Sequence, residues 1–317
     1  MNILITGSAG FIGFHTAKKL LERGDNVIGI DNFNDYYDVS LKEARNKILE
    51  TFPNFKLYRL DFSDLKRLEQ VFKSEKIEKI CHLGAQAGVR YSLENPHAYE
   101  ITNISGTLNL LEMARNYKIK DFVFASSSSV YGDNKKVPFS ESDNVDNPIS
   151  IYAATKKADE LMAYTYHHLY GLNCTGLRFF TVYGPWGRPD MALFKFIKLI
   201  TAGKEIPVYG NGQHKRDFTY IEDIISGVLS AIDNPFGYEI INLGNNQPIT
   251  LKYFIEIIEK ELNQKASKKM LPKQPGDVDE TYADIIKAKK LLNYEPKTSI
   301  EDGVKKFIEW YKEYYKI

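Results

Sequence analysis

Apolar runs of strand length alternate with segments of helical periodicity along the first half of the chain. The strand-like runs are Ile3–Thr6, Asn26–Ile30, Lys56–Leu60, Lys79–Leu83, Phe122–Ser126 and Asn173–Phe179. The amphipathic segments between them include Phe11–Arg23, Leu65–Lys73, Asn103–Asn116 and Ile151–Leu169. Parallel strands need long crossover connections, which helices supply. The alternation therefore predicts an α/β fold: a doubly wound parallel sheet with helices on both faces.

The pattern loosens after residue 180, where residues 184–189 form a run rich in glycine and proline. Further helices are expected at Ala192–Ala202, Glu222–Asp233, Leu251–Leu262 and Ile300–Tyr315, and a further strand at Ile240–Leu243. We predict a first domain over residues 1–180, with a segment near 206–243 returning to its sheet. A smaller α/β domain over residues 181–317 is expected to bind the substrate.

Composition limits the partners of the chain. The net charge of +1 gives no electrostatic reason to expect nucleic acid. No apolar stretch has membrane-spanning length, and no signal peptide is recognisable, so we expect a cytoplasmic protein without a membrane partner. Cys81 and Cys174 lie inside strand-like runs, where buried thiols are a better interpretation than metal ligands or a disulfide.

A glycine-rich turn follows the first strand-like run, with Gly7, Gly10 and Gly13 spaced Gly-x-x-Gly-x-x-Gly. Such a turn lets backbone amides approach a pyrophosphate at a helix N-terminus, although an ordinary strand–helix turn can also contain this motif. Asp31 ends the second strand, where a carboxylate would accept the adenosine ribose hydroxyls and repel a 2′-phosphate. The sequence therefore predicts NAD rather than NADP. Two interpretations of Asp61 remain: a contact to the adenine, or a helix cap.

Tyr152 and Lys156 are four residues apart on a helix that Pro148 and Ser150 introduce. This spacing places both side chains on one helical face. A nearby ammonium favours the phenolate, which makes Tyr152 a candidate general base. The chain contains 21 tyrosines, so the Tyr-x-x-x-Lys pattern gains its weight from its position after a serine-rich strand end.

That strand end contains Ser126, Ser127, Ser128 and Ser129. The carboxyl edge of a central parallel strand is where such sheets bind ligands. Ser127, 25 residues before Tyr152, is the hydroxyl expected to bond the reacting oxygen. A polar turn without function is the alternative interpretation.

Together these motifs resemble the extended short-chain dehydrogenase/reductases of the NAD-dependent epimerase/dehydratase family, which act on nucleotide sugars. The resemblance covers essentially the whole chain. It implies a Rossmann-type fold and a tightly bound NAD that is recycled in each turnover. It also implies that the tyrosine takes a proton from a sugar hydroxyl and that the lysine holds the nicotinamide ribose. The residues expected to contact NAD are Gly7, Gly10, Phe11, Ile12, Gly13, Asp31, Asn32, Asp61, Phe62, Gln86, Tyr152 and Lys156.

The reaction type is indicated by the residues before Val130. Dehydratases and decarboxylases of this superfamily carry an acid in the corresponding loop, because elimination or proton removal beside a keto carbon requires a second acid/base. Ser127, Ser128 and Ser129 occupy these positions here. Hydroxyls orient a substrate but are poor acids and bases. The missing carboxylate favours epimerisation, in which C4 is oxidised and then reduced from the opposite face.

Residues 31–38, 86–92 and 178–191 are similar to segments of the bacterial UDP-glucuronate 4-epimerases. The resemblance implies 4-epimerisation of UDP-glucuronate to UDP-galacturonate through a transient 4-keto intermediate. It also implies that the product is used in polysaccharide biosynthesis. Thr181 stands where UDP-galactose epimerases have an asparagine. We hypothesise that Thr181 and Arg188, helped by the serine hydroxyls, hold the sugar carboxylate and prevent decarboxylation of the β-keto acid. A solvent-exposed charge or a phosphate contact are the alternatives for Arg188.

Other residues are expected near the substrate. Arg90 is interpreted as a positioning residue close to cofactor or substrate, and Arg216 resembles the family arginine that contacts the diphosphate. Gln274 replaces a second family arginine. Asp277 fits either a bond to the uridine ribose or a turn cap. No metal is expected, since this chemistry needs none.

Other functions remain open at this stage. Within enzymes, a UDP-glucose or UDP-N-acetylglucosamine 4-epimerase is the first alternative, and a UDP-glucuronate decarboxylase the next. A non-catalytic NAD-sensing protein or scaffold is disfavoured because Ser127, Tyr152 and Lys156 are all present. The apolar faces of residues 103–116 and 151–169 suit a homodimer, as in related enzymes, but core packing explains them equally well.

Overall fold

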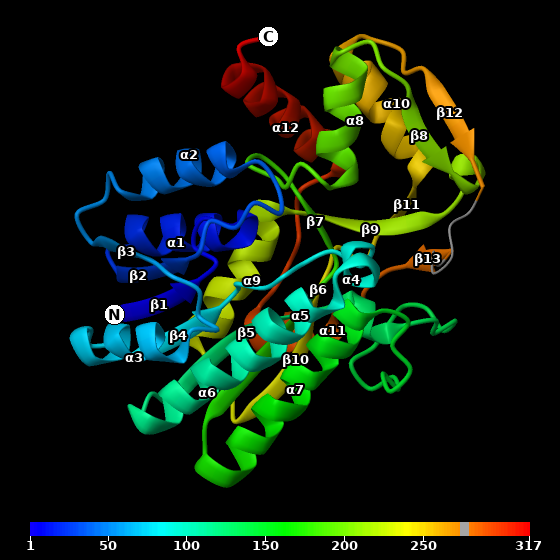
Figure 1. Ribbon diagram of the computed structural model, residues 1–317. Helices are drawn as coiled ribbons and strands as arrows, with labels where there is room; N and C mark the ends of the chain where they lie inside the picture. Colours follow the sequence, from blue (N-terminus) through cyan, green and yellow to red (C-terminus); the bar gives the residue numbers. More distant parts are fainter. Residues whose placement is uncertain (273–278) are drawn as a thin grey trace.

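The structure is a computed structural model that describes residues 1–272 and 279–317. Its larger part is a seven-stranded parallel sheet with the order β10-β6-β5-β4-β1-β2-β3 (Figure 1). The strands are β1 (Asn2–Thr6), β2 (Asn26–Asp31), β3 (Phe55–Arg59), β4 (Lys79–His82), β5 (Asp121–Ser127), β6 (Asn173–Phe179) and β10 (Tyr238–Leu243). The predicted doubly wound parallel sheet is confirmed.

Helices cover both faces of this sheet (Figure 1). One face carries α3 (Leu65–Ser74), α6 (Gly106–Asn116) and α7 (Ile151–Tyr170). The other carries α1 (Phe11–Glu22), α9 (Ile221–Asp233) and α11 (Ile286–Leu292), with α2 (Val39–Leu49) packed outside α1.

Alternate residues of a strand serve the two faces, as the pleat requires. In β1, Ile3 and Ile5 join the core under α1 and α9, whereas Leu4 joins the core under α3 and α6. All three side chains are fully buried. Burial on both faces explains why the strands appear in the sequence as continuous apolar runs.

A second, smaller group of strands is built around β9 (Lys215–Tyr220). Strand β9 pairs with β7 (Thr181–Tyr183), β11 (Pro248–Thr250) and β13 (Glu280–Thr281). The chain passes directly from β6 of the large sheet to β7 of this one at Phe180, whose amide still bonds the Leu243 carbonyl in β10. Residues just after this crossing therefore lie between the two sheets.

A two-stranded sheet and three helices complete this side of the molecule (Figure 1). The elements are β8 (Ile206–Tyr209), β12 (Lys268–Leu271), α8 (Ala192–Thr201), α10 (Leu251–Leu262) and α12 (Ile300–Tyr315). A short helical turn, η3 (Gly210–Gly212), follows β8 directly, and three others lie elsewhere: α4 (Tyr91–Glu94), α5 (Pro96–Tyr99) and η2 (Ser128–Tyr131). In the described residues, no helix is both long enough and apolar enough to cross a membrane.

The start of α6 differs from the prediction. The periodicity suggested one helix from residue 103, but α6 begins at Gly106 and follows a π-helical segment, η1 (Glu100–Ser105). The Asn103 side chain is used elsewhere, because it bonds the backbone of Gln86. At Gly106, a Cβ would lie 2.4 Å from the Phe62 ring, so this position needs glycine. Local bulges of this kind occur often at functional sites.

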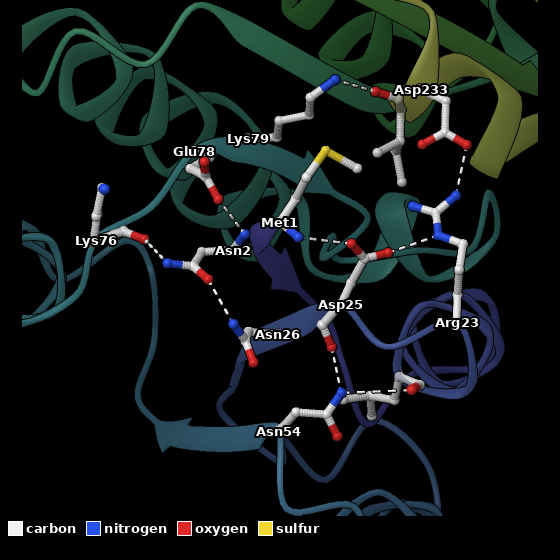
Figure 2. Close-up of polar contacts among 12 residues, drawn as sticks. Met1, Asn2, Arg23, Asp25, Asn26, Asn54, Lys76, Glu78, Lys79 and Asp233 are labelled. Carbon is white, nitrogen blue, oxygen red and sulfur yellow. Dashed lines mark hydrogen bonds and ion pairs between the residues drawn. The ribbon is translucent and has the colours of Figure 1, made fainter.

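A polar network fixes the amino ends of the strands, opposite the ligand edge of the sheet (Figure 2). Asp25 accepts hydrogen bonds from the Met1 amino group (2.9 Å) and from Arg23 Nε (2.7 Å). Arg23 also donates to Asp233 at the end of α9 (2.6 Å). Burial alone would raise the pKa of Asp25, but these two cations hold it below its usual value. The network joins β1, α1 and α9.

Candidate active site

The glycine-rich turn brings the backbones at the ends of β1 and β4 into close contact. Gly7 has φ +68°, and a Cβ there would lie 2.7 Å from Gly84 Cα. A Cβ on Gly13 would lie 2.0 Å from the Gly7 carbonyl oxygen. Gly10 is the N-cap of α1 and has no side chain to accept hydrogen bonds from the first helical amides. These amides and the positive end of the helix are therefore available to an anion.

Asp31, at the end of β2, faces the same turn. Its two carboxylate oxygens accept one backbone N–H each, from Ala9 (3.0 Å) and from Phe33 (2.8 Å). Burial raises the pKa of Asp31, while these bonds and the Lys42 ammonium oppose the rise. A carboxylate has further lone pairs that can accept ribose hydroxyls. The turn and this carboxylate together fit a dinucleotide with an unmodified adenosine ribose.

The catalytic candidates lie on α7. Ser150 is the N-cap of this helix, and its side chain accepts from the Ala153 amide (3.1 Å). The Lys156 side chain is buried and pairs with Asp159 at 3.0 Å. The Tyr152 ring meets the edge of Tyr99 with ring centroids 6.0 Å apart. Both Tyr152 and Lys156 face the same cavity as the glycine-rich turn.

The serine run forms a tight turn at the end of β5. Ser127 Oγ accepts from the Ser129 amide (3.2 Å) and from the Ser129 hydroxyl (2.9 Å). Both bonds use Ser127 as the acceptor, so its own proton can be donated to a ligand. Below the turn, Ser126 donates to Glu160 (2.6 Å), which forms a two-point ion pair with Arg178 at 2.8 Å. The serines therefore rest on a buried, well-connected polar network.

The substrate candidates form the opposite wall. Thr181 lies at the crossing from β6 to β7, and Arg216 reaches the cavity from β9. Arg188 forms a two-point ion pair with Asp190, through Nε at 3.0 Å and Nη2 at 2.5 Å. The Arg90 guanidinium lies over the Tyr209 ring, 5.2 Å from its centroid, and both residues line the cavity.

One cavity of about 900 Å³ joins these walls. This volume lies near the upper end of the range for ligand pockets, and residues from both walls line the cavity. The predicted residues that line it are Gly7, Gly10, Phe11, Ile12, Gly13, Asp31, Asn32, Phe62, Gln86, Arg90, Ser127, Ser128, Ser129, Tyr152, Lys156, Thr181, Arg188 and Arg216. The structure thus gathers residues from both halves of the sequence into a single site.

Comparison with known proteins agrees with this geometry. Residues 4–307 match the family model described as GDP-mannose 4,6 dehydratase. The chain belongs to the NAD-dependent epimerase/dehydratase family. It is 50% identical to the UDP-glucuronate 4-epimerase of Thermodesulfobacterium geofontis, covering 98% of this chain and 96% of that one.

Solved structures of similar proteins superpose over nearly the whole chain. The UDP-glucuronic acid 4-epimerase of Bacillus cereus, in complex with UDP-glucuronic acid and NAD, has a TM-score of 0.92 and 36% identity, covering 99% of this chain and 100% of that chain. The UDP-glucose 4-epimerase of Thermotoga maritima, with UDP-glucose, has a TM-score of 0.90 and 32% identity, with the same coverage.

Three residues singled out in the sequence of this epimerase/dehydratase site need comment. Asp61 is not among the residues that line the cavity; its carboxylate accepts from Asn32 (2.8 Å) and from the Ser63 amide and hydroxyl. The alternative interpretation as a cap of α3 is wrong, because the N-cap is Asp64. Gln274 and Asp277 lie outside the described residues, so their assignments stay predictions.

Several site residues were not found from the sequence. Lys42 lines the cavity and donates to Asn34 through its carbonyl (2.6 Å) and its side-chain oxygen (2.7 Å). Burial lowers the pKa of Lys42, and the Asp31 carboxylate opposes this. Arg45, one turn further along α2, is fully buried. The signal available was the spacing of Lys42 and Arg45, which places both on one face of a helix.

Arg45 connects the cofactor side of the site to the substrate side. Its Nη1 donates to the Ala9 carbonyl in the glycine-rich turn (2.8 Å). Its Nη2 donates to the carbonyl of Trp186 (2.6 Å), two residues before Arg188. His15 of α1 makes a parallel contact to the Pro185 carbonyl (2.9 Å). The two loops are therefore held together from one side.

Gln86 is held in place by Asn103 of the π-helical segment. The Gln86 amide donates to Asn103 Oδ1 (2.8 Å), and Asn103 Nδ2 donates to the Gln86 carbonyl (3.1 Å) and to Thr155 of α7 (3.0 Å). Within the described part of the chain, Gln86 Nε2 is buried without a hydrogen-bond partner. This amide lines the cavity and is available to a ligand.

The glycine-rich turn gives a direct test of the dinucleotide site. Gly13→Ala places a methyl group against the Gly7 carbonyl and forces the turn to shift. We expect NAD affinity to fall about 100-fold, as for a displacement near 1 Å at a binding site. Calorimetric titration with NAD measures the loss. Gly237→Ala is the control, because its Cβ meets only the His167 ring, and unchanged affinity in Gly13→Ala would contradict the assignment.

Proposed function

We propose that this chain is an NAD-dependent UDP-glucuronate 4-epimerase that forms UDP-galacturonate through a transient 4-keto intermediate. The observation that carries the proposal is the shared cavity. Tyr152, Lys156 and Ser127 face it together with the glycine-rich turn, and Thr181 and Arg188 face it from the opposite wall. Relatives that are named UDP-glucuronate 4-epimerases support the choice of sugar.

Each catalytic candidate has a chemical role in this reaction. The chemistry that NAD supplies when bound is the reversible removal of hydride from C4. Tyr152 removes the proton of the C4 hydroxyl and later returns it. Lys156 stabilises the phenolate by its positive charge. Ser127 donates its proton to the C4 oxygen and fixes the position of this atom.

The wall around Thr181 is proposed to hold the sugar carboxylate. The Arg188 guanidinium has five N–H donors, of which Nε and one Nη2 proton bond Asp190. The remaining edge, around Nη1, can approach a ligand carboxylate. Thr181 and the hydroxyls of residues 128 and 129 complete a neutral donor set. Held in this way, the carboxylate is kept out of the alignment from which a β-keto acid loses carbon dioxide.

We further propose that residues 1–180 bind the cofactor, with the segment near 206–243 returning to the large sheet, and that residues 181–317 bind the nucleotide sugar. Arg90, Arg216 and Asp277 are assigned to the substrate side. Asp61 is assigned to the adenosine end through its partner Asn32, which lines the cavity.

Turnover of UDP-sugars tests the proposed reaction. Purified protein is expected to convert UDP-glucuronate to UDP-galacturonate without added NAD, and chromatography of the products detects this. Tyr152→Phe should lower kcat by about 10²- to 10⁴-fold, because the general base is lost. Tyr164→Phe is the matched control, since Tyr164 is an exposed tyrosine of the same helix. Faster conversion of UDP-glucose than of UDP-glucuronate would contradict the assignment.

Arg188→Ala tests the carboxylate site. We expect weaker binding of UDP-glucuronate and the appearance of a UDP-pentose, because the 4-keto acid is no longer held away from decarboxylation. Product analysis by mass spectrometry distinguishes the pentose from the epimer. Arg115→Ala, a change at the far end of α6, is the control. Normal turnover without pentose in Arg188→Ala would show that this arginine has another role.

The chain is proposed to form a homodimer in the cytoplasm. Leu161, Tyr164 and Leu169 of α7 are more than half exposed, and Leu108 of the neighbouring α6 is 40% exposed. A second copy would cover this apolar face. Size-exclusion chromatography with light scattering should give a dimer for the wild type and a monomer for Leu161→Glu. A monomeric wild type would rule out the proposed homodimer.

The cytoplasmic location is supported by the two cysteines. Cys81 and Cys174 are free and buried, and burial raises the pKa of Cys174 to about 12. Unpaired thiols suit a reducing compartment.

A further inference from the structure

A row of buried polar side chains leads from the glycine-rich turn to the catalytic lysine. Thr6 Oγ1 lies 2.7 Å from His82 Nδ1, and His82 Nε2 lies 3.0 Å from Thr107 Oγ1. Thr107 helps to lower the pKa of the Asp159 carboxyl group, whose Oδ1 is buried without a hydrogen-bond partner among the described residues. Asp159 Oδ2 in turn binds the Lys156 ammonium at 3.0 Å. All five side chains are at least 98% buried.

The hydrogen bonds of this row have one consistent direction. The Gly84 amide donates to Thr6 Oγ1 (3.0 Å), so the Thr6 proton is directed to His82 Nδ1. His82 then carries its proton on Nε2 and donates to Thr107. Thr107 Oγ1 accepts from His82, so its own proton is free to turn toward the unpartnered Oδ1 of Asp159, which can only accept. Burial lowers the pKa of His82 far below its usual value, which keeps the ring neutral and suits this order.

The pair of Asp159 and Lys156 is the end point of the row. An ammonium buried without a counter-charge loses its proton, because burial disfavours the charged form. Among the described residues, Asp159 is the one carboxylate within 4.0 Å of Lys156 Nζ. This contact uses one of three N–H donors. The other two remain for Tyr152 and for a ligand in the cavity that Lys156 lines.

We propose that Asp159 is a positioning residue of this enzyme: it keeps Lys156 charged and directed at Tyr152, and the hydroxyl of Thr107, at the end of the buried row, assists it. This inference rests on the proposed function for the role of the phenolate. It adds residues from β1, β4 and α6 to the support of the catalytic helix.

Other charged groups around the pair are already compensated. Glu160, next to Asp159 on α7, is bound by Arg178 of β6 and by Ser126 of β5. Burial raises the pKa of Tyr99 from α5 well above its usual value, so this ring is neutral at working pH. Burial also raises the pKa of Asp159, whereas Lys156 and Thr107 lower it. Among the described residues, Asp159 is therefore the carboxylate that pairs with Lys156.

The decisive variant is Asp159→Asn, which keeps the shape and an acceptor oxygen but removes the charge. We expect kcat at pH 7 to fall about tenfold, the equivalent of one pH unit of titration. The acidic limb of the kcat profile should move to higher pH, because the phenolate is harder to form beside a less charged lysine. KM for UDP-glucuronate should stay the same. Thr107→Val should shift the limb in the same direction by less.

Glu160→Gln is the matched control, because this neighbouring carboxylate is equally buried but binds Arg178. This variant is expected to lower the free energy of unfolding without shifting the acidic limb of the kcat profile. An unshifted limb in a folded Asp159→Asn protein would overturn the proposal. If Asp159→Asn does not fold, an unshifted limb in Thr107→Val overturns it instead.

A substrate-free measurement separates this inference from the proposed function. Nuclear magnetic resonance of ¹³C-labelled lysine follows the charge of Lys156 directly. The charge should be lost at lower pH in Asp159→Asn than in the wild type, and equal behaviour would refute the role of Asp159. A wild type that is inactive on UDP-glucuronate would refute the proposed function without affecting this result.

Discussion

The whole site depends on the close contact of two backbone segments at the end of β1. Gly7 and Gly84 meet where the strand order reverses, between β1 and β4, and neither position has room for a side chain. In doubly wound sheets the connections leave this switch point in opposite directions and open a crevice above it. Because these positions are glycines, the bottom of the crevice is bare backbone, which a pyrophosphate can approach.

Strands of the large sheet and the helix α7 supply the wall of the cavity that bears the catalytic candidates. The passage of the chain from β6 to β7 at Phe180 supplies the opposite wall. Since β6 belongs to one sheet and β7 to the next, Thr181 is positioned by the packing of both. The serine turn after β5 and the lysine on α7 rest on two buried ionic systems, around Glu160 and Asp159. Adjacent residues of one helix therefore support different parts of the same site. Rigid support of this kind is what precise positioning of a substrate requires.

Sequence reasoning was most successful where local pattern and topology coincide. All seven strands of the large sheet and the helix that bears Tyr152 follow from apolar runs and from a serine cap, which are local signals. The strands around β9 were missed as a sheet, since β13 has two residues and pairs with a segment 65 positions away. The ion pairs of Arg188 with Asp190 and of Lys156 with Asp159 were also missed, because spacing alone does not show which charged neighbours pair. The π-helical segment was missed because its contacts are with the distant residues Gln86 and Phe62. The carboxyl groups that tune a site are hard to find in a chain with 41 of them.

Arg45 has a consequence for the dynamics of the protein. This fully buried guanidinium bonds the glycine-rich turn and the loop before Arg188 at the same time. Within the described parts of the chain it has no acidic partner, and its hydrogen bonds go to carbonyls and to the Tyr37 hydroxyl. Neither loop can open without leaving a buried cation short of acceptors, which is costly. Opening of the glycine-rich turn is thus coupled to movement of the loop before Arg188, so slow release of a bound dinucleotide would follow from one arginine as much as from the contacts that the cofactor makes itself.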